Sequence, residues 1–371
     1  MMEWPKFTNP YIGIKPPPGV HVPEREELLS SICTKDEPRK GFPYPPEAPT
    51  FWIKYGDAVY WNEVCAQSVA YDGLRQIESS VRAPGVYYAF QEGRVTYIVM
   101  EYIPGKTALQ LLKEAHDEAE KEVILQSIAS AVSELHRIPI PESRLRPAAI
   151  SGGRFRHSIF GNDYDSAPLH YESAQHFEDN ANAYLKLAFV GDTRIRDLAR
   201  EPMVFCQADL YPGNFIIDAD NRVTAIDLER TSIVPSSFAK LAVSDYVHGY
   251  GGVDISPWVY FPVTEGVDNT NALLRLRGRL SPGPEDFVEI GLELPGAEET
   301  QKRIKSTLQG QLIDEHVFVR EPTVGEIIAE WEANGRVGER PFPDIKIVDY
   351  VNDPPPLSRE YELYLSGRVN T

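Results

Sequence analysis

The chain has 371 residues, 42% of them hydrophobic and 25% charged, a composition typical of a globular protein with one large domain or two lobes. Its formal net charge of −18 argues against binding to nucleic acid or anionic lipid, because phosphate groups are neutralised by clustered Lys and Arg. No apolar stretch approaches the roughly 20 residues that span a bilayer, and no signal-peptide pattern is visible. We therefore expect a cytoplasmic protein without nucleic-acid or membrane partners, whose three scattered cysteines are reduced.

The first part of the chain predicts a proline-rich arm followed by β-structure. Eleven of the first 50 residues are proline, which favours an extended segment with one short helix near residues 24–32. A strand is predicted at Thr50–Lys54, and a helix follows at about residues 62–79. The runs VYYAFQ and VTYIVMEYI, joined by Glu92-Gly93-Arg94, predict a β-hairpin.

The later part predicts mainly helices. Apolar residues recur at the helical period from Ala108 to Arg137, which predicts one long helix. Two short strands, Phe215–Asp218 and Val223–Ile226, are joined by a turn-forming segment. A late helix is predicted to start at Thr323, where a capping box precedes an apolar stripe. His136, His157 and His248 are isolated, so we expect surface or helix-end positions for them.

This order of elements predicts an α+β fold with two lobes, a small β-rich N-terminal lobe and a larger, mainly helical C-terminal lobe. The cleft between such lobes is the expected binding site. The chain would then divide into an N-terminal extension, an N-lobe, a C-lobe and a C-terminal extension, covering residues 1–49, 50–105, 106–250 and 251–371.

The stretch VFCQADLYPGNFIID and the hairpin strand that follows it carry the residues with candidate catalytic and metal-binding side chains. Asp209 lies on a loop broken by Pro212-Gly213, Asn214 enters the short hairpin, and Asp227 leaves it. The hairpin should therefore bring the side chains of Asn214 and Asp227 together. A carboxylate plus an amide oxygen suits Mg²⁺, and a carboxylate that is not bound to metal can orient or deprotonate a hydroxyl. The alternative is that Asp209 caps a turn and Asn214 simply starts a strand.

The segments QADLYPGNFIID and VTAIDLE resemble the catalytic loop and metal-binding segment of the aminoglycoside phosphotransferase and choline kinase family. The segments FWIKYGDAVYWNE and VTYIVMEYIPG resemble its ATP-lobe segments, especially those of its fungal members. The resemblance covers roughly residues 50–245. It implies a protein-kinase-like fold and the cofactors ATP and Mg²⁺. It also implies that Asp209 is the catalytic base and that Asn214 and Asp227 are the metal ligands.

The same resemblance assigns nucleotide-binding roles upstream. Lys54 matches the strand lysine that contacts the α- and β-phosphates, and Glu63 matches the helix glutamate that pairs with it. Glu101 and Ile103 match hinge positions whose backbone groups bind adenine. The alternatives are an exposed strand lysine, a solvated acid in the first turn of a helix, and a plain edge strand.

The chain departs from the family pattern in two ways. Gln207 and Ala208 stand where relatives usually have histidine and glycine, and no glycine-rich phosphate loop precedes Lys54. Glutamine can donate and accept the hydrogen bonds that would hold the loop, so Gln207 is expected to support the loop. Glu229 stands where relatives often have an acid, and we expect either a supporting group behind the site or a surface acid.

The resemblance also implies that the acceptor site follows Asp227 in the chain. Asp245, Tyr246 and Trp258 belong to a stretch of acids and aromatic residues that suits a cationic amine or a secondary metabolite through ion pairing and cation–π contact. The alternative is that the aromatic residues belong to the core.

The sequence thus predicts a phosphotransferase that moves the γ-phosphate of ATP to a hydroxyl of a small molecule. A catalytically weak or inactive kinase-like scaffold is the rival, favoured by Gln207 and the missing glycine loop. A third possibility is other nucleotidyl chemistry on the same fold. Nothing in the sequence specifies the acceptor, the role of the C-terminal extension or the oligomeric state.

Overall fold

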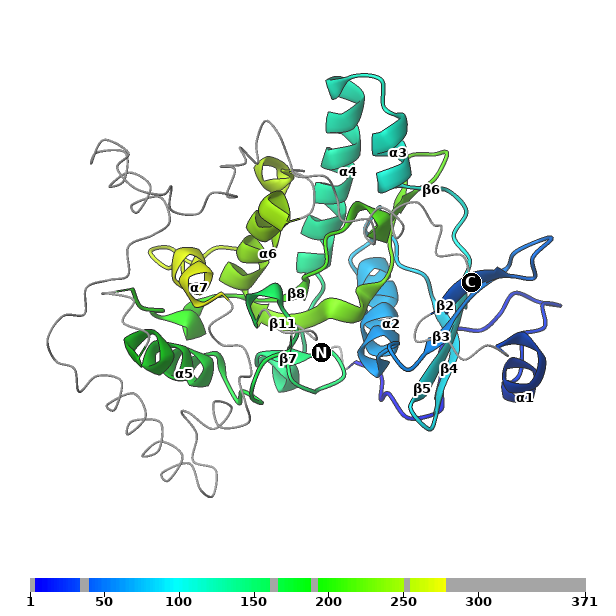
Figure 1. The fold of residues 1–371 in the computed structure, drawn as a ribbon, viewed down its shortest axis with the longest axis horizontal. Coiled ribbons are helices and arrows are strands. Elements are labelled where there is room, and N and C mark those ends of the chain that lie inside the picture. Colours follow the sequence, from blue (N-terminus) through cyan, green and yellow to red (C-terminus); the bar gives the residue numbers. More distant parts are fainter. Residues whose placement is uncertain (1–3, 34–39, 161–165, 188–192, 250–253, 278–371) are drawn as a thin grey trace, which may run out of the picture. The chain divides into compact units, whose positions relative to one another are not determined.

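The computed structural model describes residues 4–33, 40–160, 166–187, 193–249 and 254–277 of the chain, all of which fall in one compact unit. They form a β-rich lobe followed by a mainly helical lobe, as Figure 1 shows, which confirms the predicted α+β class. The late helix predicted from Thr323 lies outside the described residues. None of the helices in the described segments has the length and apolar character required to cross a membrane.

The smaller lobe is built on an antiparallel sheet with strand order β1-β4-β5-β3-β2 among the described residues. The predicted strand and hairpin are both present, and Gly93 adopts a φ of 59° at the hairpin turn, which favours glycine. The arm before residue 50 contributes β1 and β2 to this sheet as well as the expected short helix. The elements of this lobe are β1 (Tyr11–Ile12), α1 (Arg25–Glu27) with a π-helical turn at Leu28–Ile32, β2 (Lys40–Tyr44), β3 (Phe51–Gly56), α2 (Trp61–Gln76), β4 (Val86–Glu92) and β5 (Val95–Glu101).

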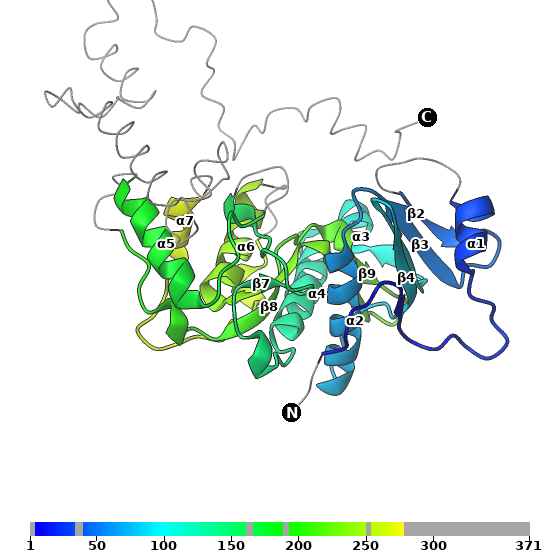
Figure 2. The same cartoon turned by 90° about the horizontal axis from the view of Figure 1, so that it is seen from below.

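The helical lobe packs around two short sheets, with strand orders β10-β9-β6 and β7-β11-β8 among the described residues. Figure 2 shows α4, α5, α6 and α7 on one side of α2 and the larger sheet on the other. Its principal elements are β6 (Lys106–Thr107), α3 (Ala108–Glu114), α4 (Glu118–His136), β7 (Ala148–Ala149), α5 (Ala174–Leu187), β8 (Met203–Gln207), β9 (Phe215–Ile217), β10 (Val223–Ala225), β11 (Thr231–Pro235), α6 (Ser236–Gly249) and α7 (Thr270–Leu276).

The single long helix predicted from Ala108 to Arg137 is wrong, because the chain breaks between α3 and α4. Asp117 is the N-cap of α4 and its side chain accepts a hydrogen bond from the backbone N–H of Glu120, at 2.9 Å. The Glu120 carboxylate in turn accepts from the N–H of His116, at 2.7 Å. These reciprocal bonds satisfy backbone donors at a helix start, so they favour a new helix over continuation of the old one.

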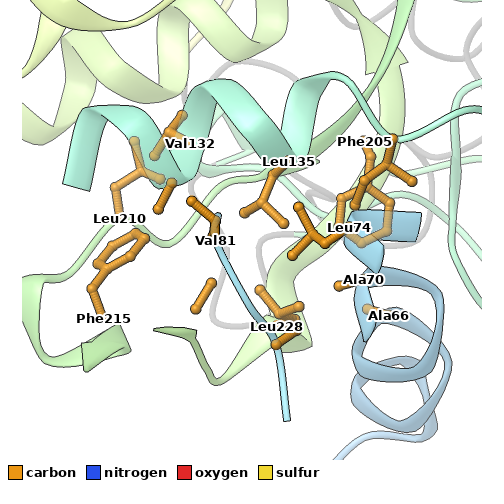
Figure 3. Packing of buried hydrophobic residues seen from close by; sticks show 14 of the residues in the cluster. Ala66, Ala70, Leu74, Val81, Val132, Leu135, Phe205, Leu210, Phe215 and Leu228 are labelled. Carbon is orange, nitrogen blue, oxygen red and sulfur yellow. The ribbon is translucent and has the colours of Figure 1, made fainter. Parts of the chain in front are cut away.

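The largest cluster of buried apolar residues joins α2 to the helical lobe. Figure 3 shows Ala66, Ala70 and Leu74 of α2 facing Leu135 of α4 and Phe205 of β8. Almost every residue in the first half of α2 is buried, polar ones included. The first half of the helix is therefore covered on all sides, and a side chain on any of its faces there is buried.

The N-terminal segment contacts both lobes. Trp4 is buried with the α2–α4 cluster, where its ring meets the ring of Phe205 edge-on at 6.5 Å. A few residues later, Tyr11 belongs to the core of the β-sheet and pairs with Ala89 of β4. The segment thus links the apolar core of the helical lobe to the edge of the sheet.

Two of the isolated histidines do not lie at the surface. His136 ends α4, as expected for a helix-end residue, but it is buried. His157 is almost completely buried, with an exposed fraction of 1%. Burial lowers the pKa of each imidazole to about 4. The side chain of His248 lies outside the described residues. The three cysteines are free thiols and all are buried.

Candidate active site

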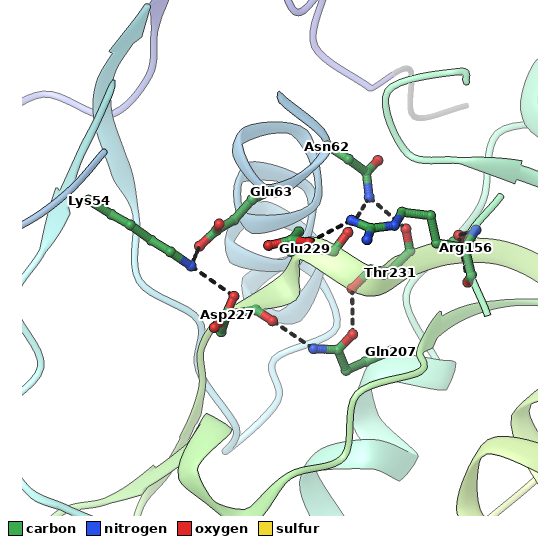
Figure 4. Close-up of polar contacts among 9 residues, drawn as sticks. Lys54, Asn62, Glu63, Arg156, Gln207, Asp227, Glu229 and Thr231 are labelled. Atoms are coloured by element: carbon green, nitrogen blue, oxygen red, sulfur yellow. Dashed lines mark hydrogen bonds and ion pairs between the residues drawn. The ribbon is translucent and has the colours of Figure 1, made fainter. Parts of the chain in front are cut away.

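Lys54 lies at the centre of the site, between two carboxylates. Its Nζ lies 2.7 Å from Oε1 of Glu63 on α2 and 2.8 Å from Oδ1 of Asp227. The side chains of Lys54 and Glu63 are 8% and 2% exposed, so they are almost removed from water. Figure 4 shows this pairing, in which β3, α2 and the segment after β10 each contribute one charged group. The structure therefore brings Lys54 and Glu63 together as the sequence predicted.

Asp227 adopts an unusual backbone conformation. Its φ and ψ are both 54°, in the left-handed region that residues other than glycine enter at a cost. Asp and Asn tolerate this region better than most residues because their short polar side chains can bond locally. The conformation ends β10 abruptly and directs the carboxylate toward Lys54.

The short hairpin brings Asn214 beside Asp227, as expected. The backbone N–H of Ile226, the residue before Asp227, donates to the carbonyl of Asn214 at 2.9 Å. The Asn214 side chain is buried, and its Nδ2 donates to the backbone carbonyl of Asp209 at 3.2 Å. Because the amide nitrogen is used for this bond, the amide oxygen is the group of Asn214 that can serve a cation.

Asp209 is half-buried on the loop between β8 and β9. Burial raises the pKa of its carboxyl, and the nearby charge of Asp227 raises it further, while Arg230 and hydrogen bonds from Tyr211 and Asn214 oppose the rise. The Tyr211 N–H donates to Oδ1 of Asp209 at 3.3 Å. A carboxylate held on a rigid loop with a raised pKa has the properties of a proton acceptor.

Gln207 connects the loop that carries Asp209 to the segment that carries Asp227. Its Nε2 donates to the backbone carbonyl of Asp227 at 2.8 Å, and its Oε1 accepts from the Thr231 hydroxyl at 3.2 Å. The side chain is buried, and Figure 4 shows it on the side of Asp227 that faces away from Lys54. The amide therefore uses both its donor and its acceptor capacity within the protein.

Glu229 is buried and is not a surface acid, which removes one of the two alternatives for it. Its carboxylate pairs with Arg156, whose Nη1 lies 2.6 Å from Oε1. The guanidinium lies over the ring of Tyr60, 4.5 Å from the centroid. Sequence reasoning missed Arg156, because the residue lies on a loop without periodicity and far from Glu229 in the chain.

Asn62, the neighbour of Glu63, connects the same region to α2. Its side chain donates to the backbone carbonyls of Glu229, at 2.7 Å, and Thr231, at 2.9 Å. Its amide oxygen accepts from the N–H of Ser151, at 3.0 Å. One buried asparagine thus ties α2 to two segments of the helical lobe.

The hinge segment follows β5. The N–H of Glu101 donates to Gly85, and the N–H of Tyr102 donates to Thr50, so both amides are used by the protein. Ile103 has no backbone hydrogen bond among the described residues. The Glu101 side chain accepts from the N–H of Gly85 at 2.8 Å. A ligand at this position would therefore meet the free backbone groups of Ile103 rather than the amide of Glu101.

The strand β2 precedes β3 in the chain, and the start of β2 lies near the site. Gly41 lies opposite Lys54 in the β2–β3 pairing, whereas Tyr44 lies opposite Phe51, further from the lysine. Residues 34–39, which lead into β2, are outside the described residues. Within the segment KGFPYPPEAP that precedes β3, the start of β2 is therefore the part that pairs with Lys54.

The predicted acceptor residues are only partly described. Asp245 and Tyr246 lie on α6, and their side chains are outside the described residues. Trp258 lies in a short 3-10 helix that packs against α4 and α6, and its exposed fraction is 37%. The neighbouring Tyr260 is tied to α4 through Ser133 and His136.

The donor set fits a divalent cation that prefers oxygen ligands. Ligand oxygens of Glu63, Asp227 and Glu229 lie within 4.8 Å of one another, and Asn214 lies beside Asp227. Lys54 contacts Glu63 and Asp227, and Arg156 contacts Glu229. The Asp227 side chain is 31% exposed, whereas those of Glu63 and Glu229 are 2% and 6% exposed, so Asp227 and Asn214 are the residues that would hold Mg²⁺.

Comparison with known proteins gives matches over the same region. Residues 70–236 match the family model described as the phosphotransferase enzyme family. An aminoglycoside 3'-phosphotransferase from Streptomyces ribosidificus is 27% identical over 180 residues, which are 48% of this chain and 62% of that protein.

Solved structures of similar description align over most of the chain. A thermostable mutant of aminoglycoside phosphotransferase APH(4)-Ia gives a TM-score of 0.40 at 12% identity, covering 74% of this chain and 87% of the other. Spectinomycin phosphotransferase APH(9)-Ia in an AMP-bound complex gives 0.38 at 15% identity, covering 76% and 91%. The family model therefore matches the part of the chain that contains Asp209, Asn214 and Asp227, and the chain spans 62% of the length of the aminoglycoside 3'-phosphotransferase that it resembles.

Proposed function

We propose that the chain is a phosphotransferase that uses ATP and Mg²⁺ to phosphorylate a hydroxyl group of a small molecule. The observation that carries the proposal is the position of Lys54 between Glu63 and Asp227, with ion-pair distances of 2.7 and 2.8 Å. A buried lysine fixed by a helix glutamate, next to an aspartate that follows a hairpin, is the arrangement that protein kinases use to hold nucleotide phosphates.

Each residue then has a separate task. Lys54 binds phosphate oxygens, and Glu63 keeps its ammonium group in place. Asn214 and Asp227 would hold Mg²⁺, which supplies neutralisation of the phosphate charge when it is bound. Asp209 orients the acceptor hydroxyl and takes its proton, a task that its raised pKa supports. Most of the rate enhancement would come from positioning and charge stabilisation.

The acceptor that we propose is a hydroxylated amine of the aminoglycoside kind. The 27% identity to an aminoglycoside 3'-phosphotransferase supports it, and so does the net charge of −18, which attracts cations. Asp245, Tyr246 and Trp258 remain the proposed contacts to the amine.

The test separates an enzyme from a nucleotide-binding scaffold. ATP affinity, with and without Mg²⁺, and phosphate transfer to a panel of aminoglycosides are measured for the wild type, Asp209→Asn and Asp227→Asn. We expect Asp209→Asn to lower transfer by about 10²–10⁴ while ATP affinity changes little. We expect Asp227→Asn to weaken Mg²⁺-dependent ATP binding as well.

Asp220→Asn is a matched control, because Asp220 lies in the turn of the same hairpin and its side chain is 71% exposed. It should leave both quantities unchanged. A wild type that binds Mg·ATP but transfers phosphate to no acceptor, while Gln207→His gains transfer, would favour the scaffold. Wild-type protein that binds no nucleotide would exclude both the enzyme and the nucleotide-binding scaffold.

A further inference from the structure

Three buried or half-buried acids beside the site, Glu63, Asp227 and Glu229, are paired with two cations, Lys54 and Arg156. The oxygens of Glu63, Asp227 and Glu229 lie within 4.8 Å of one another. Lys54 contacts Glu63 and Asp227, whereas Arg156 contacts Glu229 at 2.6 Å. Glu229 therefore belongs to the same cluster as the two acids that contact Lys54, yet its carboxylate is directed to a different cation.

The contact between Arg156 and Glu229 is well shielded from solvent. The two side chains are 8% and 6% exposed. The guanidinium lies on the ring of Tyr60, and the backbone N–H of Arg156 donates to Ser232 Oγ at 2.9 Å. Such contacts hold a planar guanidinium in one orientation, which a lysine could not reproduce. Figure 4 shows Arg156 reaching Glu229 from the side opposite Lys54.

The backbone at Glu229 is held independently of Arg156. Asn62 donates to the carbonyls of Glu229 and Thr231, and the N–H of Ala208 donates to the carbonyl of Arg230 at 3.3 Å. Loss of the guanidinium would therefore leave the loop in place and release only the Glu229 carboxylate. A buried carboxylate that has lost its partner favours another cation, and Lys54 is the cation that contacts the two other acids of this cluster.

We propose that Arg156 is a positioning residue that keeps Glu229 away from Lys54 and from the cation site, so that Lys54 stays paired with Glu63. The inference rests on the proposed function, because the lysine is the group that would receive the phosphates. Without Arg156, the charged Glu229 carboxylate would lower the affinity for nucleotide by pairing with Lys54. Removing the charge of Glu229 would restore that affinity.

The test compares Arg156→Met, Glu229→Gln and the double variant, with Mg·ATP affinity and phosphate transfer as readouts. We expect Arg156→Met to weaken both by about 10–100-fold, the usual effect of removing a group that orients a ligand-binding residue. The double variant should return to within about threefold of Glu229→Gln, because the competing charge is gone. If Arg156 acts only through packing, the double variant will be no better than Arg156→Met, and the proposal falls.

Arg144→Met is the matched control, because Arg144 also places its guanidinium over an aromatic ring, that of Trp4, away from the site. It should change neither readout. Should Arg156→Met fail to fold, Arg156→Lys takes its place. The lysine should give a smaller loss, which Glu229→Gln again reverses, and a loss that is not reversed contradicts the proposal.

A stability measurement keeps the inference separate from the proposed function. Wild-type protein that binds no Mg·ATP would refute the function, but the competition for Lys54 would remain measurable by urea unfolding. A double-mutant cycle of Lys54→Met and Glu229→Gln gives the interaction free energy between the two side chains. This interaction should be small when Arg156 is present and should stabilise the fold in the Arg156→Met background. Equal coupling in both backgrounds would overturn the role assigned to Arg156.

Discussion

Buried His157 should make the fold sensitive to mild acid. Its Nδ1 accepts from the N–H of Ile159 at 3.1 Å, so the proton lies on Nε2, which donates to the carbonyl of Phe238 at 2.9 Å. A second proton would break the bond to Ile159 and place a charge in an apolar core. Burial therefore lowers the pKa of His157 from 6.5 to about 4.

The sign and size of the effect follow from linkage. Below pH 6.5 His157 is protonated in the unfolded chain but stays neutral in the folded chain, so the free energy of unfolding decreases as the pH falls toward 4. For a pKa of 6.5 when unfolded and about 4 when folded, the loss between pH 7 and pH 5 is about 2 kcal/mol. His136, whose pKa is also lowered to about 4 by burial, adds a similar loss.

The perturbation that isolates one imidazole is His157→Gln, which keeps a donor and an acceptor but does not titrate. Unfolding in urea is measured at pH 7 and pH 5 for the wild type, for His157→Gln and for His170→Gln, an exposed control. The loss on acidification should be about 2 kcal/mol smaller in His157→Gln than in the wild type, and unchanged in the control. Equal losses in all three proteins would refute the reasoning.

Three further changes test the backbone, the packing and the polar interior by urea unfolding. Asp227→Ala should be less stable than Asp227→Asn by about 1 kcal/mol, because both lose the charge but alanine tolerates the left-handed conformation poorly; equal midpoints would contradict this. Gly73→Ala should cost about 1–3 kcal/mol, since its Cβ would lie 2.6 Å from Cγ2 of Ile138, and adding Ile138→Ala should cost less than the sum; strict additivity would argue against the contact. Glu201→Gln should lower the free energy of unfolding by about 2–3 kcal/mol, because the Glu201 carboxylate accepts from the N–H and the hydroxyl of Ser237. The glutamine would place an NH₂ group against one of these donors. An unchanged midpoint would contradict the reasoning.

The site was predictable where the pattern is local. The β4–β5 hairpin could be read from two apolar runs around Gly93, and the short hairpin guaranteed that Asn214 and Asp227 would meet. The pairing of Lys54 with Glu63 needed more than spacing, because a strand lysine and a helix acid meet only if the helix packs on the sheet. The family resemblance supplied that step.

Other features depend on contacts between distant residues. Arg156 and Glu229 are 73 positions apart, and neither a period nor a motif connects them. The burial of His157 is likewise set by residues such as Phe238, far along the chain. By contrast, the break between α3 and α4 was visible in the sequence, because Asp117 and Glu120 have the spacing of a helix start.

The N-terminal segment has a consequence for how the chain is made. Trp4 finds its partner Phe205 only when about 200 further residues have left the ribosome, which takes roughly 10–40 s at usual rates of synthesis. During that interval the indole ring of Trp4 cannot pack against Phe205. The emission of Trp4 should therefore shift to the blue late in refolding, after the helices have formed, and would report the moment at which the two lobes join.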